Sequence, residues 1–462
     1  MATETGTGRQ SSGQVSTTAP GETLSVYDGI VMVVGIVIGI GIFATAPLVA
    51  QFAGNEFNFL MVWLLGGLLT LIGALCYAEI ATVYPSAGGE YHFLSRAYGR
   101  PLALLFAWAR GTVIQTGAIA LVAFVYGDYA NAVIPLGASG SAIHAAIAVA
   151  VFTGINMLGT LQGKITQHIF TALDVGAIVL LIVAGLVVSL STGGPTTAST
   201  PAATDGSGYG MIGAAMVLVL LTFGGWNEAA YLSAELKDAR RNMVKVLTIS
   251  IVFITAIYFL AGWSYLAALG FEGLKSANAA AADVSRVAFG DTGAKILAVM
   301  VCGAAISTLN ATIFTGARVF YALGRDLPNL SFFGVWSERG ENPANAFLLQ
   351  GGIALALVGL GALTRDGVKA MVEYTSPVFW FFMLLVAISL FVFRRRDPDS
   401  GHAGGFRVPL YPVTPAIFVA ICAWMLYSSL AFFGWASLVG VAVLAAGLPL
   451  LLLDRRAADV RT

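Results

Sequence analysis

Residues 34–43 read Val-Gly-Ile-Val-Ile-Gly-Ile-Gly-Ile-Phe and decide how the first apolar run of the chain folds. They place Gly35, Gly39 and Gly41 in the middle of a run that extends from residue 27 to 50. Each glycine weakens a helix by about 1 kcal/mol relative to alanine, and non-helical backbone at membrane depth is tolerated only where it lines a cavity. The stretch predicts a helix broken at Gly39-Ile40-Gly41; the alternative is that Gly35 and Gly39 form a close contact with another helix.

A helix broken in this way exposes backbone groups that can bind a small charged solute. Free N–H groups at the start of the second half-helix suit a carboxylate, because the positive end of the helix dipole lies there. Free carbonyl oxygens suit an ammonium group or a metal cation. We therefore expect a substrate site at the break in the first run.

The whole chain has the composition of a membrane protein. Of its 462 residues, 58% are hydrophobic and only 10% are charged, whereas soluble proteins carry about 25% charged residues. Because a spanning helix needs about 20 apolar residues, we predict an all-α membrane protein with twelve transmembrane helices. The predicted spans are residues 27–50, 59–82, 102–126, 141–157, 169–189, 211–233, 244–269, 294–323, 345–363, 372–393, 415–433 and 435–453.

These spans are expected to form one domain in the bacterial inner membrane. Residues 25–455 are predicted to be a single transmembrane transporter domain, with a disordered N-terminal tail at 1–24 and a C-terminal tail at 456–462. Most basic residues fall on one side of the predicted spans, so the positive-inside rule places both termini in the cytoplasm. The net charge is zero, which argues against a nucleic-acid partner.

A second interruption lies five spans after the first. Residues 221–228 bring Gly224, Gly225, an asparagine and a carboxylate into an apolar run. Glycine-broken segments at corresponding positions of two halves are typical of inverted repeats in secondary transporters, where they mark the substrate site. We predict one repeat over about 27–190, a second over about 209–393, and two additional helices over about 415–453.

The chain resembles the amino acid-polyamine-organocation superfamily, and within it the L-type-like amino acid transporter branch. The resemblance covers residues 25–453 and implies a LeuT-type 5+5 inverted repeat, with broken helices 1 and 6 and transport by alternating access. It is carried by Val34-Gly35 with Gly39–Phe43, by Cys76–Glu79 with Pro85–Tyr91, by Phe223–Asn227, and by Asn310 with Phe314-Thr315.

The resemblance also implies which groups hold the substrate. The N–H groups of Ile40 and Gly41, beside Gly39, would bind the carboxylate, and the carbonyls of Val37, Leu221 and Gly224 would accept from the ammonium group. Side chains that would set specificity are Ile36, Phe223, Asn227 and Glu228, although Glu228 could instead cap a half-helix. This chain departs from the family pattern in having Ile40 where a small residue is usual and Leu221 where a gating aromatic is common.

A coupling site is predicted next to the first break. The resemblance implies a cation held by the carbonyls of Gly35 and Ile38 and by the hydroxyls of Ser307 and Thr308; hard oxygen ligands suit sodium. Asp174 stands where sodium-independent relatives often have a lysine, and we expect it to complete a sodium site or to take up a proton. The alternatives are a carboxyl group that is permanently neutral or one that is paired with Arg110.

The predicted function is secondary active transport of amino acids or related amines, coupled to sodium or protons. An uncoupled exchanger is the alternative, and a membrane-embedded enzyme or a channel is a weaker one. The spans contain no catalytic constellation, and no GxxxxGK[ST] motif occurs, so neither an enzyme activity nor an ATPase subunit is expected. We expect no cofactor other than the coupling ion. Residue types alone do not name the substrate, because its charged groups would meet backbone.

Overall fold

The fold is described from a computed structural model of the chain. The structure describes residues 24–84, 89–158, 164–192, 208–228, 236–326, 328–335, 343–364, 366–398 and 406–449. The predicted terminal tails lie outside these residues, except for residue 24.

Within the described ranges the chain is helical, with one isolated bridge between Leu24 and Leu236. The segments η2 and η3 are 3-10 helices, and η1 is a π-helix. In chain order the elements are α1 (Val26–Val37), α2 (Gly41–Ala53), α3 (Glu56–Val83), α4 (Gly89–Tyr98), α5 (Arg100–Ala109), η1 (Arg110–Gln115), α6 (Thr116–Val133), α7 (Gly140–Leu158), α8 (Lys164–Thr192), α9 (Gly208–Thr222), η2 (Trp226–Glu228), α11 (Ala239–Ser276), α12 (Ala280–Asp326), η3 (Pro328–Gly334), α13 (Ala344–Ala362), α14 (Gly367–Arg396), α15 (Val413–Ala431) and α16 (Trp435–Ala445).

The helices have the length and apolar character of membrane spans. Among the described residues, nine helices are long and apolar enough to cross a membrane, and a tenth candidate is the bent pair formed by α1 and α2. Two shorter apolar helices, Met211–Thr222 and Trp435–Ala445, lie in the remaining predicted spans. The prediction of an all-helical membrane protein is confirmed at this level; the count of twelve and the 5+5 repeat stay predictions.

The first apolar run is broken where its glycines predict. Helix α1 ends at Val37 and α2 begins at Gly41, and the two half-helices are bent by 52° relative to each other. The intervening turn is closed by hydrogen bonds from the N–H of Ile38 to the carbonyl of Val34, at 2.7 Å, and from the N–H of Gly39 to the carbonyl of Val37, at 2.9 Å. Residues 38–40 thus form a non-helical turn between the two half-helices.

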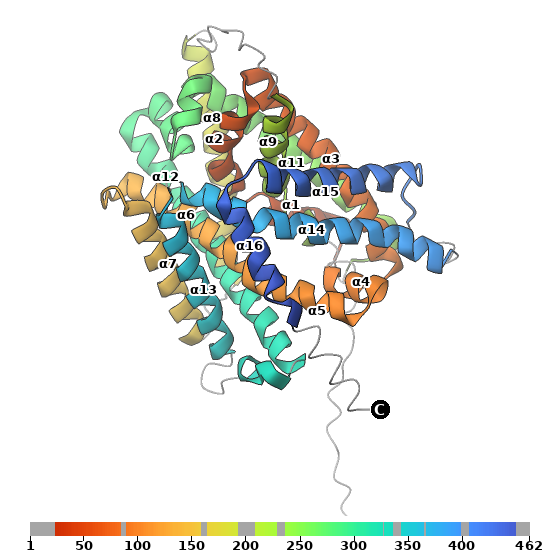
Figure 1. The fold of residues 1–462 in the computed structure, drawn as a ribbon. Coiled ribbons are helices and arrows are strands. Elements are labelled where there is room, and N and C mark those ends of the chain that lie inside the picture. Colours follow the sequence, from red (N-terminus) through yellow and green to blue (C-terminus); the bar gives the residue numbers. More distant parts are fainter. Residues whose placement is uncertain are drawn as a thin grey trace, which may run out of the picture.

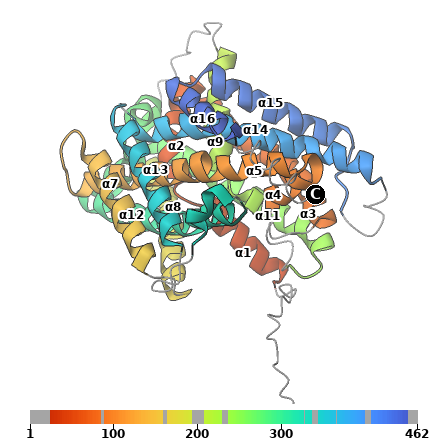
Figure 2. The same ribbon diagram turned by 60° about the horizontal axis from the view of Figure 1, so that its bottom comes forward.

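The helices pack into one bundle around the broken segments. Figure 1 shows α14 and α15 running alongside each other, and α7 beside α13 at one edge. The turned view in Figure 2 shows α1 against α11. Close approach depends on small residues: a Cβ atom on Gly66 of α3 would lie 2.3 Å from Val219 of α9, so these two helices meet at the glycine.

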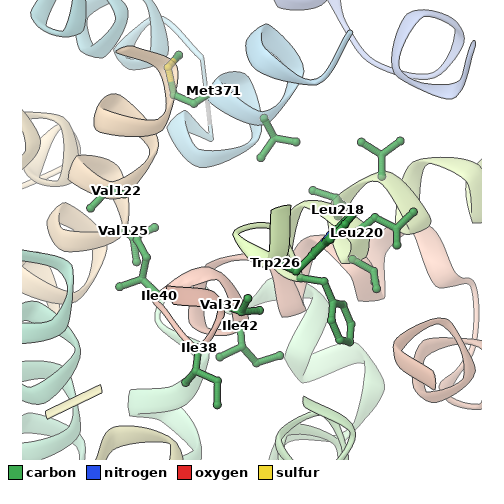
Figure 3. Packing of buried hydrophobic residues seen from close by; sticks show 14 of the residues in the cluster. Val37, Ile38, Ile40, Ile42, Val122, Val125, Leu218, Leu220, Trp226 and Met371 are labelled. Carbon is green, nitrogen blue, oxygen red and sulfur yellow. The ribbon is translucent and has the colours of Figure 1, made fainter. Parts of the chain in front are cut away.

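The side chains around the first break belong to the buried core. Figure 3 shows Ile40 next to Val125 of α6, whereas Ile38 projects from another side of the same turn. Ile38 and Ile40 are both buried, as are Val37 and Ile42. The break is therefore enclosed by packed side chains and does not face lipid.

Two features of the bundle interior bear on the site. The π-helix η1 inserts a wide turn between α5 and α6; such turns are rare and are often found at functional sites. Glu79 is paired with Arg394 through two contacts of 2.7 Å and accepts a hydrogen bond of 2.6 Å from the N–H of Val408. This carboxylate therefore holds α3, α14 and the segment before α15 together.

Candidate functional site

The break between α1 and α2 and the end of α9, where the second break is predicted, meet at a cavity of about 640 Å³. This volume falls within the range of about 300–1,000 Å³ that is typical of small-molecule sites. Most of the predicted substrate residues line it, and so does most of the predicted coupling site. The predicted residues among its lining are Gly35, Ile36, Val37, Gly39, Ile40, Gly41, Asp174, Leu221, Gly224, Asn227, Ser307 and Thr308.

The N-terminus of α2 supplies hydrogen-bond donors at the cavity. Ile40 is the residue that caps this helix, and its side chain makes no capping hydrogen bond. In the described part of the chain, no hydrogen bond is donated by the N–H of Ile40 or of Gly41. Both residues line the cavity. Two backbone donors at a helix N-terminus can bind a carboxylate, because the partial positive charge of the helix lies there.

Two of the three carbonyls predicted to accept from an ammonium group already accept hydrogen bonds, and they differ in how many. The carbonyl of Val37 accepts from the N–H of Gly39 at 2.9 Å and from the hydroxyl of Tyr258 at 2.7 Å. The carbonyl of Leu221 accepts from the N–H of Gly224 at 2.9 Å. Since a carbonyl oxygen has two lone pairs, Leu221 has more capacity for an ammonium group than Val37 in this conformation.

Two of the predicted residues, Phe223 and Ile38, are not brought into the cavity. The ring of Phe223 is fully buried against Tyr258, with a ring-centroid separation of 5.0 Å, and does not line the cavity. Ile38 is also buried away from it. The side chain of Glu228 lies outside the described residues. Phe223 therefore packs the outside of the second break and does not form a substrate wall here.

The predicted coupling residues Gly35, Asp174, Ser307 and Thr308 line one cavity. The Oδ1 atom of Asp174 is buried and has no hydrogen-bond partner among the described residues. The hydroxyl of Thr308 donates to the carbonyl of Ala304 at 3.2 Å, which leaves its oxygen able to bind a cation. The described residues contain no group of three or more His, Cys, Asp or Glu side chains that could hold a metal ion. A cation here would depend on hydroxyl, carbonyl and single-carboxylate oxygens.

Tyr258 of α11 connects the two breaks, although no sequence motif singles it out. Its hydroxyl lies 2.7 Å from the carbonyl of Val37, before the first break, and 3.3 Å from the carbonyl of Thr222, before the second. A second link is the 2.6 Å hydrogen bond between the hydroxyls of Thr45 and Thr222. A buried tyrosine hydroxyl usually has a partner, but nothing in the sequence indicates which one.

A charged cluster forms another wall of the cavity. Arg110, at the start of η1, is 3.3 Å from Glu90 of α4, and the amide of Asn227 donates to the other oxygen of Glu90 at 2.6 Å. All three residues line the cavity. The sequence points to Arg110 only as a possible partner of Asp174 and does not point to Glu90, because α4 is too short to read as a span.

A second cavity, of about 220 Å³, lies on the far side of α2. Gly41 lines the larger cavity and Ala44 lines the smaller one, so less than one helical turn of α2 separates them. Phe43, between these two residues, is buried and packs edge-to-face on Tyr129 at 6.5 Å. Asp366 lines the smaller cavity, before α14, and burial raises the pKa of its carboxyl group.

Known proteins are similar in sequence to this chain over most of its length. The sequence pattern of the family described as amino acid permease matches residues 24–445. The b(0,+)-type amino acid transporter 1 of Homo sapiens is 31% identical over 82% of this chain and 77% of its own length. The b(0,+)-type amino acid transporter 1 of Mus musculus is 27% identical over 88% of this chain and 84% of its own length. The large neutral amino acids transporter small subunit 2 of Oryctolagus cuniculus is 28% identical over 90% of this chain and 77% of its own length.

Proposed function

This chain belongs to the amino acid permease family, and we propose that it carries amino acids or related amines across the bacterial inner membrane by alternating access. It is a transport protein and not an enzyme. The observation that carries the proposal is the meeting of the first helix break and the end of α9 at one cavity, where the N–H groups of Ile40 and Gly41 have no partner among the described residues. An α-amino acid offers a carboxylate for these donors and an ammonium group for the carbonyls of Leu221 and Gly224.

The short barrier between the two cavities supports the alternating-access part of the proposal. The smaller cavity is lined by residues from the loops that the predicted orientation, with both termini in the cytoplasm, places outside the cell. Only the turn of α2 that contains Ile42 and Phe43 lies between the lining residues Gly41 and Ala44. A small rotation of α2 against α6 and α9 would therefore be enough to change which cavity the substrate site joins.

Counterflow tests this function directly. Purified protein is placed in proteoliposomes loaded with an unlabelled amino acid, and a trace of the same amino acid, labelled, is added outside. We expect transient accumulation of label, because a carrier exchanges its substrate through one site at a time. A channel would equilibrate the label without accumulation. Absence of counterflow for every amino acid and amine tested would contradict the proposed function.

We further propose that Asp174, with Gly35, Ser307 and Thr308, couples transport to a sodium or proton gradient. The support is that a carboxyl oxygen without a hydrogen-bond partner among the described residues lies in the same cavity as two hydroxyls and the predicted substrate groups. Such an atom is costly in the membrane interior unless a cation or a proton occupies it for part of the cycle. Uncoupled exchange is the second candidate, and the following experiment separates the two.

Asp174→Asn is expected to lose stimulation by an imposed gradient while counterflow continues. The asparagine keeps the size of the side chain and removes its charge, so the predicted loss is about tenfold or more, the scale on which removing a supporting group weakens an ion site. Uptake is measured with a sodium gradient, with a proton gradient and with neither. Asp291→Asn is the control, because the Asp291 side chain is 84% exposed. An Asp174→Asn protein that responds to both gradients as the wild type does would exclude the coupling role.

A further inference from the structure

Three charged side chains line the larger cavity among the described residues: Glu90, Arg110 and Asp174. Asp174 belongs to the proposed coupling site, where a cation or a proton would neutralise it. Glu90 and Arg110 form the separate ion pair described above. Among the described lining residues, Glu90 and Arg110 are therefore the charged groups that remain to interact with the side chain of a bound substrate.

The pair is built into the protein and is not a surface contact. The side chain of Glu90 is only 6% exposed, and that of Arg110 is 22% exposed. Each carboxylate oxygen of Glu90 has a donor: Arg110 at 3.3 Å and the amide of Asn227 at 2.6 Å. A buried carboxylate is stable only when it is paired and hydrogen-bonded. Arg110 and Asn227 both donate to Glu90.

The pair is also connected to the second helix break. Asn227 lies two residues after Gly225, in the short helix η2 that continues directly from the break. Gly225 in turn packs against Ile36 of α1. The charged cluster is therefore one side chain away from the backbone that would hold the ammonium group of the substrate.

The charges of this pair decide which substrate side chains can approach. A cationic side chain could bind Glu90 only by displacing Arg110. The positive charge of Arg110 would also repel it. An anionic side chain would have to displace Glu90 from Arg110. An uncharged side chain disturbs neither contact. Within the pair the two opposite charges offset each other, so the pair disfavours both kinds of charged side chain.

We propose that the Glu90–Arg110 pair, oriented by Asn227, determines specificity and makes the site select amino acids with uncharged side chains over those with cationic ones. This inference rests on the proposed transport function and assigns the substrate class of the same cavity. Arg110 acts as the internal counter-ion that keeps Glu90 from serving as a site for a cationic side chain.

Arg110→Gln tests the assignment, because it removes the positive charge that is paired with Glu90. Counterflow is measured with labelled leucine and labelled arginine, and the readout is the ratio of the two initial rates. We expect the arginine-to-leucine ratio to rise by about tenfold or more, since an uncompensated charge in a partly buried site acts strongly on an opposite charge nearby. In the double variant Glu90→Gln with Arg110→Gln, the ratio should return to the wild-type value.

Reciprocal and control variants keep the test decisive. Glu90→Gln should raise the glutamate-to-leucine ratio, and Arg110→Lys should keep the wild-type arginine-to-leucine ratio. If Arg110→Gln does not insert or fold, the glutamate ratio of Glu90→Gln decides the proposal by itself. The matched control is Arg394→Gln, which breaks the Glu79–Arg394 pair outside the cavity lining. It should lower thermal stability without changing any ratio.

The outcomes separate this inference from the proposed function. If Arg110→Gln lowers leucine and arginine transport in the same proportion, so that their ratio stays constant, the pair acts on the transport cycle and the specificity role is overturned. If the wild-type protein shows no counterflow with any amino acid, the transport function itself fails. Active wild-type protein with unchanged ratios in the variants contradicts only the inference.

Discussion

Replacing Gly225 by alanine is expected to reduce the transport rate by about a hundredfold or more, equivalent to about 2.7 kcal/mol in the rate-limiting step. Gly225 has a φ of +104°, a conformation that costs other residues about 1 to 3 kcal/mol. A Cβ atom at this position would also lie 2.9 Å from Cγ2 of Ile36 and 3.2 Å from its carbonyl oxygen. The substitution therefore pushes the two breaks apart at the point where they form the cavity.

The Gly225 prediction is checked by initial counterflow rates, normalised to the amount of folded protein in the liposomes. Gly359→Ala is the matched control, because Gly359 lies within α13 and a Cβ atom there meets nothing within 4 Å. This control should transport at the wild-type rate. A Gly225→Ala protein that transports within twofold of the wild type would show that contact between the breaks is not required.

Tyr258→Phe is expected to lower the maximal transport rate by about tenfold or more, with a smaller change in the substrate concentration that gives half-maximal rate. The variant keeps the ring, and with it the packing on Phe223 and Trp63. It removes the hydroxyl near the carbonyls of Val37 and Thr222. Loss of a buried partner costs about 1 to 3 kcal/mol, and here the loss falls on a contact that links the backbone before the first break to the end of α9.

The Tyr258 prediction needs a readout that a purely structural defect would not change. Substrate-induced thermal stabilisation reports binding, while counterflow reports the full cycle, and we expect binding to survive when cycling slows. Tyr427→Phe serves as the control, since Tyr427 is 62% exposed. Equal losses of binding and of transport in Tyr258→Phe would indicate that the hydroxyl holds the site together without coordinating its movement.

The backbone part of the site could be predicted from the sequence, and most of its side-chain part could not. Three glycines within one apolar run predict a break because their helix-weakening effects are local and add together. The position of Phe223, buried against Tyr258 and away from the cavity, could not be predicted, since the turn at Gly224 and Gly225 decides which way the preceding ring faces. Glu90 was missed because its pairing with Arg110 depends on how α4 folds back against η1.

Tyr258 illustrates the same limit for hydrogen bonds. A tyrosine in an apolar run is compatible with a lipid interface, a packed core or a buried hydrogen bond, and only the rotation of α11 distinguishes these possibilities. By contrast, Asp174 could be singled out in advance, because a short carboxylate within a span is costly wherever it faces. A sequence thus identifies groups whose burial in the membrane costs free energy in every orientation. It does not identify groups whose role depends on which way the helix turns them.

The π-helix η1 changes how this transporter can vary in evolution. A π-turn amounts to one additional residue within an otherwise regular helix, and the cavity residues Arg110, Gln115 and Val122 lie at its start, at its end and beyond it. Deleting one residue within 111–114 would remove the wide turn and restore a regular α-helix, and the residues after the deletion would keep nearly the same facing, because a π-turn absorbs its additional residue within one turn. A single-codon deletion would then change the cavity around Arg110 and Gln115 and leave the face that α6 presents to the substrate in place.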